Sequence, residues 1–228
     1  MPELLMDEGM PVERSVGGLH DALVPRIMEL VDAKATVLDV GCGSGAWLER
    51  LARNGFTNLV GIDQDVGQLR SEAGQFVQGD LDSVSDWPVP AKSYDLITAI
   101  EVIEHLSNIG HFLAQTSKLL APDGYLLLTT PNILSLAARL RLLVHADMKQ
   151  FGRLGDQTHL FPVVLGTFPR LLARHQLQLV DHWGYPADGR TLTSRGTANL
   201  IARMLRILLP EPVPGDVLCM LVRHAGAT

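Results

Sequence analysis

Short apolar runs alternate with amphipathic segments along most of the chain. Runs with little charge predict strands at 36–40, 58–62, 75–78, 94–100, 125–130, 177–185 and 216–223. Apolar residues that recur every three or four positions predict helices at 18–31, 45–53, 65–72, 104–120, 133–145, 162–174 and 196–209. Strands that alternate with helices in this way imply a parallel sheet covered on both faces. The pattern therefore predicts an α/β fold.

We expect all 228 residues to form a single domain. Residues 1–31 are interpreted as an N-terminal arm, which partly caps a ligand site, followed by a helix. After the fifth predicted strand, residues 133–160 combine an apolar helix bearing Arg139 and Arg141 with a polar stretch. We interpret 133–160 as a lid that packs over the active site.

Composition narrows the range of partners. The formal net charge of −6 argues against broad affinity for nucleic acid or an anionic membrane. No uninterrupted apolar stretch approaches the length of a membrane span, and the first residues are acidic where a signal peptide would be basic. Cys42 and Cys219 give no disulfide framework and are typical of reduced thiols. We expect a cytoplasmic protein without stable membrane insertion, and no feature indicates an oligomeric state.

The strand at 36–40 runs into a glycine-rich turn with Gly41, Gly43 and Gly45, after which a helix begins. Glycines let the backbone turn sharply and let a ligand approach the main chain. Free N–H groups at a helix start also point at such a ligand. The loop therefore indicates a nucleotide-type cofactor. Because Gly41-x-Gly43-x-x-Ala46 also fits the dinucleotide fingerprint, an NAD(P)-dependent reductase is an alternative, although the chain lacks a Tyr-x-x-x-Lys pair.

Acidic residues lie at or beside the ends of four predicted strands: Asp39, Asp63, Asp80 and Glu101. In an open parallel sheet, ligands bind at the carboxyl ends of the strands. Asp63 lies eighteen residues after Gly45, where an acid would bind ribose hydroxyls or cap the next helix. Asp80 with Leu81 would suit adenine, or would be a turn aspartate. Asp39 lies inside a strand, where a cationic or amine-bearing ligand would offset the cost of burying a carboxylate.

Four motifs in this order resemble those of class I S-adenosylmethionine-dependent methyltransferases: Val37-Leu38-Asp39-Val40-Gly41-Cys42-Gly43-Ser44-Gly45, Gly61-Ile62-Asp63, Gly79-Asp80-Leu81 and Tyr94-Asp95-Leu96-Ile97. The resemblance extends over residues 18–185. It implies a Rossmann-like, doubly wound sheet of seven mostly parallel strands, with an antiparallel last strand at 216–223. It also implies S-adenosyl-L-methionine as the cofactor and S-adenosyl-L-homocysteine as the product.

The same resemblance implies which residues contact the cofactor. The glycine loop would pack against its methionine part, Asp63 would hold the ribose hydroxyls, and Asp80 with Leu81 would contact adenine. The full set of expected cofactor-binding residues is Asp39, Gly41, Cys42, Gly43, Gly45, Asp63, Gln64, Asp80, Leu81 and Glu101.

A group of ionisable residues follows the strand at 94–100. Glu101-Val102-Ile103-Glu104-His105 is similar to a motif of the small ubiquinone-biosynthesis-like subgroup, whose members methylate oxygen, nitrogen or carbon. If a helix begins near Glu101, the side chains of Glu101, Glu104 and His105 share one face. We expect His105, which titrates near neutrality, to be a base or a substrate-positioning residue, with Glu101 as the second catalytic residue. A purely structural role is the remaining interpretation, because a helix dipole also favours glutamates in a first turn.

The same spacing is similar to the metal cluster of small-RNA 3′-terminal 2′-O-methyltransferases, in which a later histidine, here His159, completes the site. In that alternative, Glu101, Glu104, His105 and His159 would hold magnesium, manganese or iron, and the acceptor would be an RNA end. The main hypothesis involves no metal and no nucleic acid.

The main hypothesis is an enzyme that transfers a methyl group from S-adenosylmethionine to an oxygen or nitrogen of a small molecule, glycan or lipid. A non-catalytic binding module is a further alternative. The acceptor site would be shaped by residues 1–30, 133–160 and 186–210, which carry no diagnostic motif. The sequence therefore does not identify the acceptor.

Overall fold

The structure is a computed structural model that describes residues 11–91, 93–153, 155–192 and 213–226. The helix predicted at 196–209 and the first ten residues of the predicted N-terminal arm lie outside these described residues.

Seven strands form one sheet in the order β3-β2-β1-β4-β5-β7-β6. Their bounds are β1 Thr36–Val40, β2 Asn58–Asp63, β3 Gln75–Gln78, β4 Tyr94–Ile100, β5 Leu120–Pro131, β6 Leu177–Tyr185 and β7 Val217–His224. Strands β1 to β5 pair in parallel, whereas β7 is antiparallel to both β5 and β6. The predicted seven-stranded sheet with an antiparallel last strand is confirmed.

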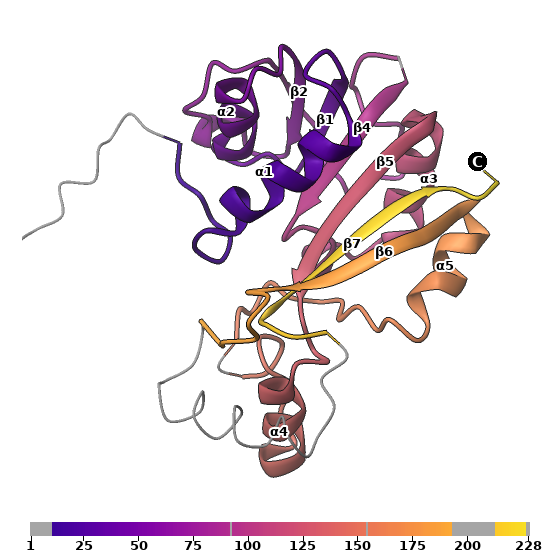
Figure 1. The fold of residues 1–228 in the computed structure, drawn as a ribbon. Coiled ribbons are helices and arrows are strands. Elements are labelled where there is room, and N and C mark those ends of the chain that lie inside the picture. The colour runs from indigo at the N-terminus through magenta and orange to yellow at the C-terminus, as the bar shows by residue number, and fades with distance from the viewer. Residues whose placement is uncertain (1–10, 92, 154, 193–212, 227–228) are drawn as a thin grey trace, which may run out of the picture.

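Helices cover both faces of this sheet, as Figure 1 shows. They are α1 Leu19–Leu30, α2 Ala46–Arg53, α3 Ile109–Leu119, α4 Leu136–His145 and α5 Phe168–Arg174. Successive residues of a strand point to opposite faces, so Leu127 of β5 joins the core under α1 and α2, while Leu126 and Leu128 join the core under α3 and α5. The doubly wound fold is thereby confirmed.

The helix predicted at 65–72 is only a short 3₁₀ turn, η1 Val66–Gln68. The carboxylate of Asp63 accepts the main-chain N–H of Asp65, and the carboxylate of Asp65 accepts that of Gly67. Side chains that capture nearby amides in this way compete with helical hydrogen bonds. The prediction of a full helix here was wrong for that reason.

The helix predicted at 104–120 is interrupted. A 3₁₀ turn, η2 Ile103–His105, is followed by a break, and α3 begins only at Ile109. Asp82, far earlier in the chain, accepts the amides of Ser107 and Asn108, and Asn108 then caps α3 by accepting the amide of His111. Glu101 therefore does not begin a helix, and the predicted shared helical face with Glu104 and His105 was wrong.

Helix α4 projects beyond the carboxyl end of β5, at the bottom of Figure 1. It starts three residues later than predicted, where the Ser135 side chain accepts the amide of Ala138. The side chains of Leu142, Leu143 and Val144 are exposed by 50%, 81% and 69%. None of the helices in the described ranges is long and apolar enough to cross a membrane.

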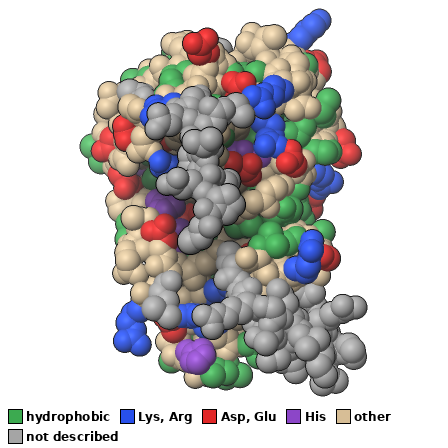
Figure 2. Space-filling view, turned by 90° about the vertical axis from the view of Figure 1, so that its left-hand side faces the viewer, with side chains coloured by type: hydrophobic (Ala, Val, Ile, Leu, Met, Phe, Trp, Pro, Cys, Tyr) green, Lys and Arg blue, Asp and Glu red, His purple; other side chains and the backbone are tan. Residues whose placement is uncertain are grey.

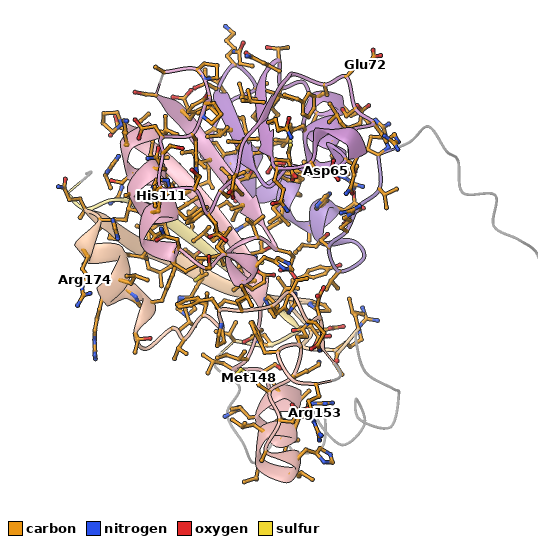
Figure 3. All side chains as sticks on the ribbon, turned by 180° about the vertical axis from the view of Figure 1, so that it is seen from behind. Asp65, Glu72, His111, Met148, Arg153 and Arg174 are labelled. Atoms are coloured by element: carbon orange, nitrogen blue, oxygen red, sulfur yellow. The ribbon has the colours of Figure 1, made fainter. Side chains whose placement is uncertain are left out.

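A buried ion pair ties the segment after α4 to the sheet. Nζ of Lys149 lies 2.5 Å from Oδ1 of Asp216, the residue just before β7, and donates to Oγ1 of Thr191 over 2.8 Å. Oδ2 of Asp216 accepts the amide of Leu192. Residues 146–153 and 155–161, here called the cap segment, are thus held against the carboxyl end of the sheet, where Figure 3 labels Met148 and Arg153 beside α4.

Candidate active site

A cavity of about 820 Å³ opens at the carboxyl ends of β1, β2 and β4. The strand order reverses between β1 and β4, which is where open α/β sheets bind ligands. The glycine loop, Asp63, Asp80, Glu101 and the cap segment all contribute to its lining. Figure 2 faces this side of the molecule and shows acidic and histidine side chains gathered beside one another.

The glycine loop has the backbone that its sequence predicts. Gly41, Gly43 and Gly45 all have positive φ values, of 75°, 52° and 83°, which residues with a side chain rarely adopt. A Cβ added to Gly41 would lie 2.5 Å from the side chain of Val102, whereas a Cβ on Gly43 would have no described atom within 4 Å. Gly41 is therefore needed for packing, and Gly43 leaves open space in the cavity.

Asp63 connects the end of β2 with this loop. Its Oδ2 accepts the amide of Gly43 over 2.8 Å, and its Oδ1 accepts the amide of Asp65 over 2.9 Å. Each carboxylate oxygen has a second lone pair for a ligand. Gln64, the next residue, lines the same cavity.

Asp39 is 3% exposed and lines the cavity from within β1. Oγ1 of Thr98 donates to its Oδ1 over 2.7 Å. Burial raises the pKa of Asp39 to about 7, and the nearby charge of Asp63 acts in the same direction. An adjacent cation would favour the ionised carboxylate, so this position suits the positively charged part of a ligand.

The predicted adenine contacts, Asp80 and Leu81, also line the cavity, and Leu81 is 9% exposed. The carboxylate of Asp80 accepts the amide of Asp82, so it also stabilises a turn. Cys42 is buried beside Gly61, where its Sγ lies 2.8 Å from the point that a Cβ would occupy. Burial raises the pKa of the Cys42 thiol, which favours a packing role for this side chain.

Glu101 adopts a left-handed conformation, with φ of 55°, at the end of β4. Its amide donates to Oγ1 of Thr129 over 3.0 Å, and that hydroxyl donates to Oε1 of Glu101 over 3.1 Å. Burial raises the pKa of Glu101 to about 7. The closed pair of hydrogen bonds fixes the carboxyl group at the cavity wall and accounts for a strained conformation that a non-glycine residue seldom adopts.

The structure brings Glu104, His105 and His159 together. One carboxylate oxygen and one nitrogen from each imidazole lie within 4.8 Å of one another. Glu104 is fully buried, and neither of its carboxylate oxygens has a hydrogen-bond partner among the described residues. Burial and the charge of Glu101 raise the pKa of Glu104 well above its usual value. Glu101 itself lies outside this group of three.

Both imidazoles of this cluster are oriented through Nδ1. Nδ1 of His105 lies 3.3 Å from the carbonyl oxygen of Thr158 and 2.9 Å from its hydroxyl oxygen, whose own proton goes to Asp156. Nδ1 of His159 lies 2.9 Å from the carbonyl oxygen of Gln150. A carbonyl only accepts, so these bonds place the proton on Nδ1 and leave Nε2 with a free lone pair in the neutral ring. Burial, and secondly His159, lower the pKa of His105. His105 is therefore neutral at neutral pH.

Sequence reasoning missed part of the lining. Gln150, Asp156 and Thr158 of the cap segment reach the cavity, because the amides of Leu160 and Phe161 donate to the carbonyl oxygen of Glu104 and hold the segment there. No periodic pattern marks these residues, and only the adjacent histidine drew attention to them. None of the residues of α4 lines the cavity.

The N-terminal segment also contributes to the cavity. Val12 donates its amide to Oγ of Ser44 and accepts the Ser44 hydroxyl on its carbonyl, each over 2.9 Å. This reciprocal pair holds residues 12–16 against the glycine loop. The arm was interpreted as a partial cap, and its described part lies on the ligand site.

Comparison with known proteins identifies the family. The model of a family described as "Methyltransferase domain" matches residues 13–202, which is most of the chain. The chain belongs to this methyltransferase family. The family favours methyl transfer over the reductase alternative.

The methyltransferase is similar to curated relatives over part of its length. It is 32% identical over 105 residues to a ubiquinone biosynthesis O-methyltransferase of Azorhizobium caulinodans, covering 42% of this chain and 40% of that protein. It is 26% identical over 144 residues to a probable S-adenosylmethionine-dependent methyltransferase of Mycolicibacterium smegmatis. This match covers 58% of this chain and 55% of that protein. The chain thus spans 40% and 55% of the lengths of these two relatives.

Solved structures share the fold. A putative sarcosine dimethylglycine methyltransferase from Galdieria sulphuraria matches with a TM-score of 0.62 at 16% identity, over 92% of this chain and 85% of that one. An S-adenosylmethionine-dependent methyltransferase from Mesorhizobium loti matches with a TM-score of 0.57 at 14% identity, over 89% and 98%. At such identities, the likeness to solved structures establishes only the fold.

Proposed function

We propose that this methyltransferase transfers a methyl group from S-adenosylmethionine to an oxygen or nitrogen of a small molecule, glycan or lipid, and releases S-adenosylhomocysteine. The name of the Azorhizobium caulinodans relative makes a hydroxyl oxygen of a small metabolite the first acceptor to test.

The observation that carries the cofactor assignment is the hydrogen bond from Gly43 to Asp63. It holds the glycine loop and the acid at the end of β2 on one cavity, with open space over Gly43 for a ligand. The remaining residues fit the chemistry of S-adenosylmethionine. Asp39 supplies a carboxyl group for its cationic part, and Asp80 with Leu81 supplies a polar group and an apolar wall for adenine.

Bound S-adenosylmethionine supplies a methyl carbon that is activated by its positively charged sulfur. The acceptor atom forms its bond to this carbon as the carbon–sulfur bond breaks, and the acceptor proton must pass to a base. Positioning of the two reactants supplies most of the rate in such a displacement. The protein's contribution is therefore a cavity that holds both reactants, an oriented acceptor and a group that takes the proton.

We assign the role of proton acceptor to His105. Its ring is held through Nδ1 by Thr158, and Nε2 of the neutral ring has a free lone pair. Thr158 is fixed in turn by its hydroxyl, which donates to Asp156 over 2.6 Å. Glu101, held by Thr129, is assigned to the cavity wall between cofactor and acceptor.

The cluster of Glu104, His105 and His159 favours a second candidate for activating the acceptor. Two imidazoles with free Nε2 atoms and a buried carboxylate without a hydrogen-bond partner among the described residues are a donor set that suits manganese, iron or zinc. Bound there, a divalent cation would lower the pKa of an acceptor hydroxyl. The three side chains would hold the cation, and Gln150 and Thr158 would orient the two rings.

The function is tested by incubating the protein with S-adenosylmethionine labelled in its methyl group and a metabolite extract from a strain in which its gene is deleted. Mass spectrometry should detect labelled products that the Gly43→Val variant does not form. Binding of NADH followed by its fluorescence, without binding of S-adenosylhomocysteine, would contradict the proposal and support the reductase.

A further inference from the structure

Two buried nitrogens beside the glycine loop have no hydrogen-bond partner among the described residues: Nδ1 of His20 and Nε1 of Trp47. His20 is 5% exposed and Trp47 is 3% exposed, and both residues line the cavity. Their rings meet edge to face, with centroids 5.1 Å apart. Buried polar groups are nearly always hydrogen-bonded in native proteins, so two adjacent exceptions on one cavity require an explanation.

The chemistry of these two nitrogens restricts which groups can be their hydrogen-bond partners. The indole nitrogen of Trp47 only donates, so it requires an acceptor. Burial lowers the pKa of His20 to about 4, so its ring is neutral near pH 7 and donates through one nitrogen. Oε2 of Glu13 lies 3.8 Å from Nδ1 of His20, which is too long for a hydrogen bond. The other oxygen of Glu13 accepts the main-chain amide of His20.

The position of the two rings points to the end of the cofactor. Trp47 is the second residue of α2 and follows the glycine loop directly. The pairing of Ser44 with Val12 brings the N-terminal segment to the same cavity, where the guanidinium of Arg14 donates to Oε1 of Gln68. Arg14 is the one arginine or lysine among the described residues that line the cavity. The corner therefore combines two neutral donors with the positive charge of Arg14, while the negative charge of Glu13 beside His20 is paired with Arg50 over 3.5 Å.

We propose that His20 and Trp47 bind the carboxylate of the amino-acid end of S-adenosylmethionine, with Arg14 supplying the opposite charge. This inference rests on the proposed function. A carboxylate has two oxygens that accept several hydrogen bonds, so one group satisfies both buried nitrogens. The acidic side chains of the cavity, including Asp39, would then contact the positively charged part of S-adenosylmethionine.

The inference is tested by calorimetry with S-adenosylmethionine and its decarboxylated analogue, which differs only in lacking the carboxylate. Wild-type protein should prefer S-adenosylmethionine. Trp47→Phe and His20→Phe should each reduce this preference about tenfold to hundredfold, because each removes one hydrogen bond to a charged group. The affinity for the decarboxylated analogue should change by less than about twofold.

Trp87→Phe is a matched control. Nε1 of Trp87 is also buried without a partner among the described residues, but Trp87 packs against Phe112 and does not line the cavity. This variant should keep the wild-type preference. If Trp47→Phe does not fold, His20→Phe decides alone. An unchanged preference in a variant that still binds S-adenosylmethionine overturns the inference only, whereas failure of the wild-type protein to bind either ligand overturns the proposed function as well.

Discussion

The main-chain amide of Gly43 donates a hydrogen bond to Oδ2 of Asp63 over 2.8 Å. This contact joins the turn after β1 to the end of β2 and so couples two motifs that the sequence presents separately. Asp63 also receives the amide of Asp65 on its other oxygen. Because its carboxylate both stabilises the loop and faces the cavity, substitutions at Gly43 and Asp63 should affect the ligand site in different ways.

Gly43→Val should abolish cofactor binding with only a modest loss of stability. The new side chain would enter open space in the cavity, and the positive φ would cost about 1–2 kcal/mol. Gly41→Val is the control, because its Cβ would clash with Val102 and should lower the melting temperature much further. Calorimetry with S-adenosylhomocysteine and thermal unfolding check both outcomes. Full affinity in Gly43→Val would contradict the placement of the cofactor.

Asp63→Ala should weaken binding of S-adenosylhomocysteine by about 1–3 kcal/mol, because ribose hydroxyls would lose a charged acceptor. Asp63→Asn keeps an acceptor for the Gly43 amide and should therefore weaken binding of S-adenosylhomocysteine less than Asp63→Ala does. Competition with adenosine, which carries the same ribose, provides the measurement. If adenosine bound the Ala variant as tightly as wild type, Asp63 would have no ribose contact.

Binding of S-adenosylmethionine should become roughly fivefold to tenfold tighter as the pH rises from about 6 to about 7.5. Asp39, with a pKa raised to about 7, is largely protonated at the lower pH, and a cationic ligand favours its ionised form. Asp39→Asn should flatten this dependence. Glu101, whose pKa is also raised to about 7, faces the same cavity, so Glu101→Gln should remove the remaining slope. If the double variant kept the full pH dependence of the wild type, neither carboxyl group would be its source.

The same shift at Asp39 predicts how the stability of the free protein depends on pH. The folded-state pKa lies above the ordinary value of 3.8, so the neutral form is favoured by folding. The resulting stabilisation is fully present below that ordinary value and is lost as the pH rises through about 7. Urea unfolding of wild type and Asp39→Asn at several pH values should show the difference. Parallel curves would mean that Asp39 ionises as readily in the folded protein as in the unfolded one.

Strands β1 to β6 were predictable because each ends at, or directly before, a glycine, a proline or an acid, although β5 begins five residues before the predicted start at 125. The ends of α1 and α2 were predicted to within one residue, but the start of α3 was not, because it depends on a contact distant in sequence. Asp82 interrupts the helix predicted at 104–120 by accepting the amides of Ser107 and Asn108, and no local pattern reveals that partner. Hydrophobic periodicity continues through the break, so the apolar pattern alone predicts a longer helix than the chain forms.

The cofactor side of the site was accessible to sequence reasoning because the glycine loop and the acids follow strands directly. The acceptor side was not. His159 meets His105 because Glu104 accepts the amides of Leu160 and Phe161, a pairing between loops without periodicity. No motif in the sequence marks His20 or Trp47, and only their unpartnered nitrogens distinguish them among the described residues.

The lid interpretation of residues 133–160 stays a prediction. The cap segment supplies Gln150, Asp156 and His159 to the cavity, whereas α4 projects away and exposes its apolar side chains. Hydrogen exchange in residues 146–160 should slow when cofactor and acceptor are both bound, because closure would shield these amides. The amides of α2 serve as an internal reference. Equal exchange in the free and doubly bound protein would exclude closure of this segment.

His105→Ala should reduce turnover by about 10²–10⁴ while leaving cofactor affinity nearly unchanged. If His105 is the base, the rate should rise with pH through a pKa below the ordinary histidine value of 6.5, since burial lowers the pKa of His105. Glu104→Gln should then reduce turnover only slightly, and a chelator should leave turnover unchanged. If Glu104, His105 and His159 hold a cation, chelation should abolish turnover, added manganese should restore it, and Glu104→Gln should be as damaging as His105→Ala. Wild-type turnover in both variants, with no response to the chelator, would leave these side chains with a packing role only.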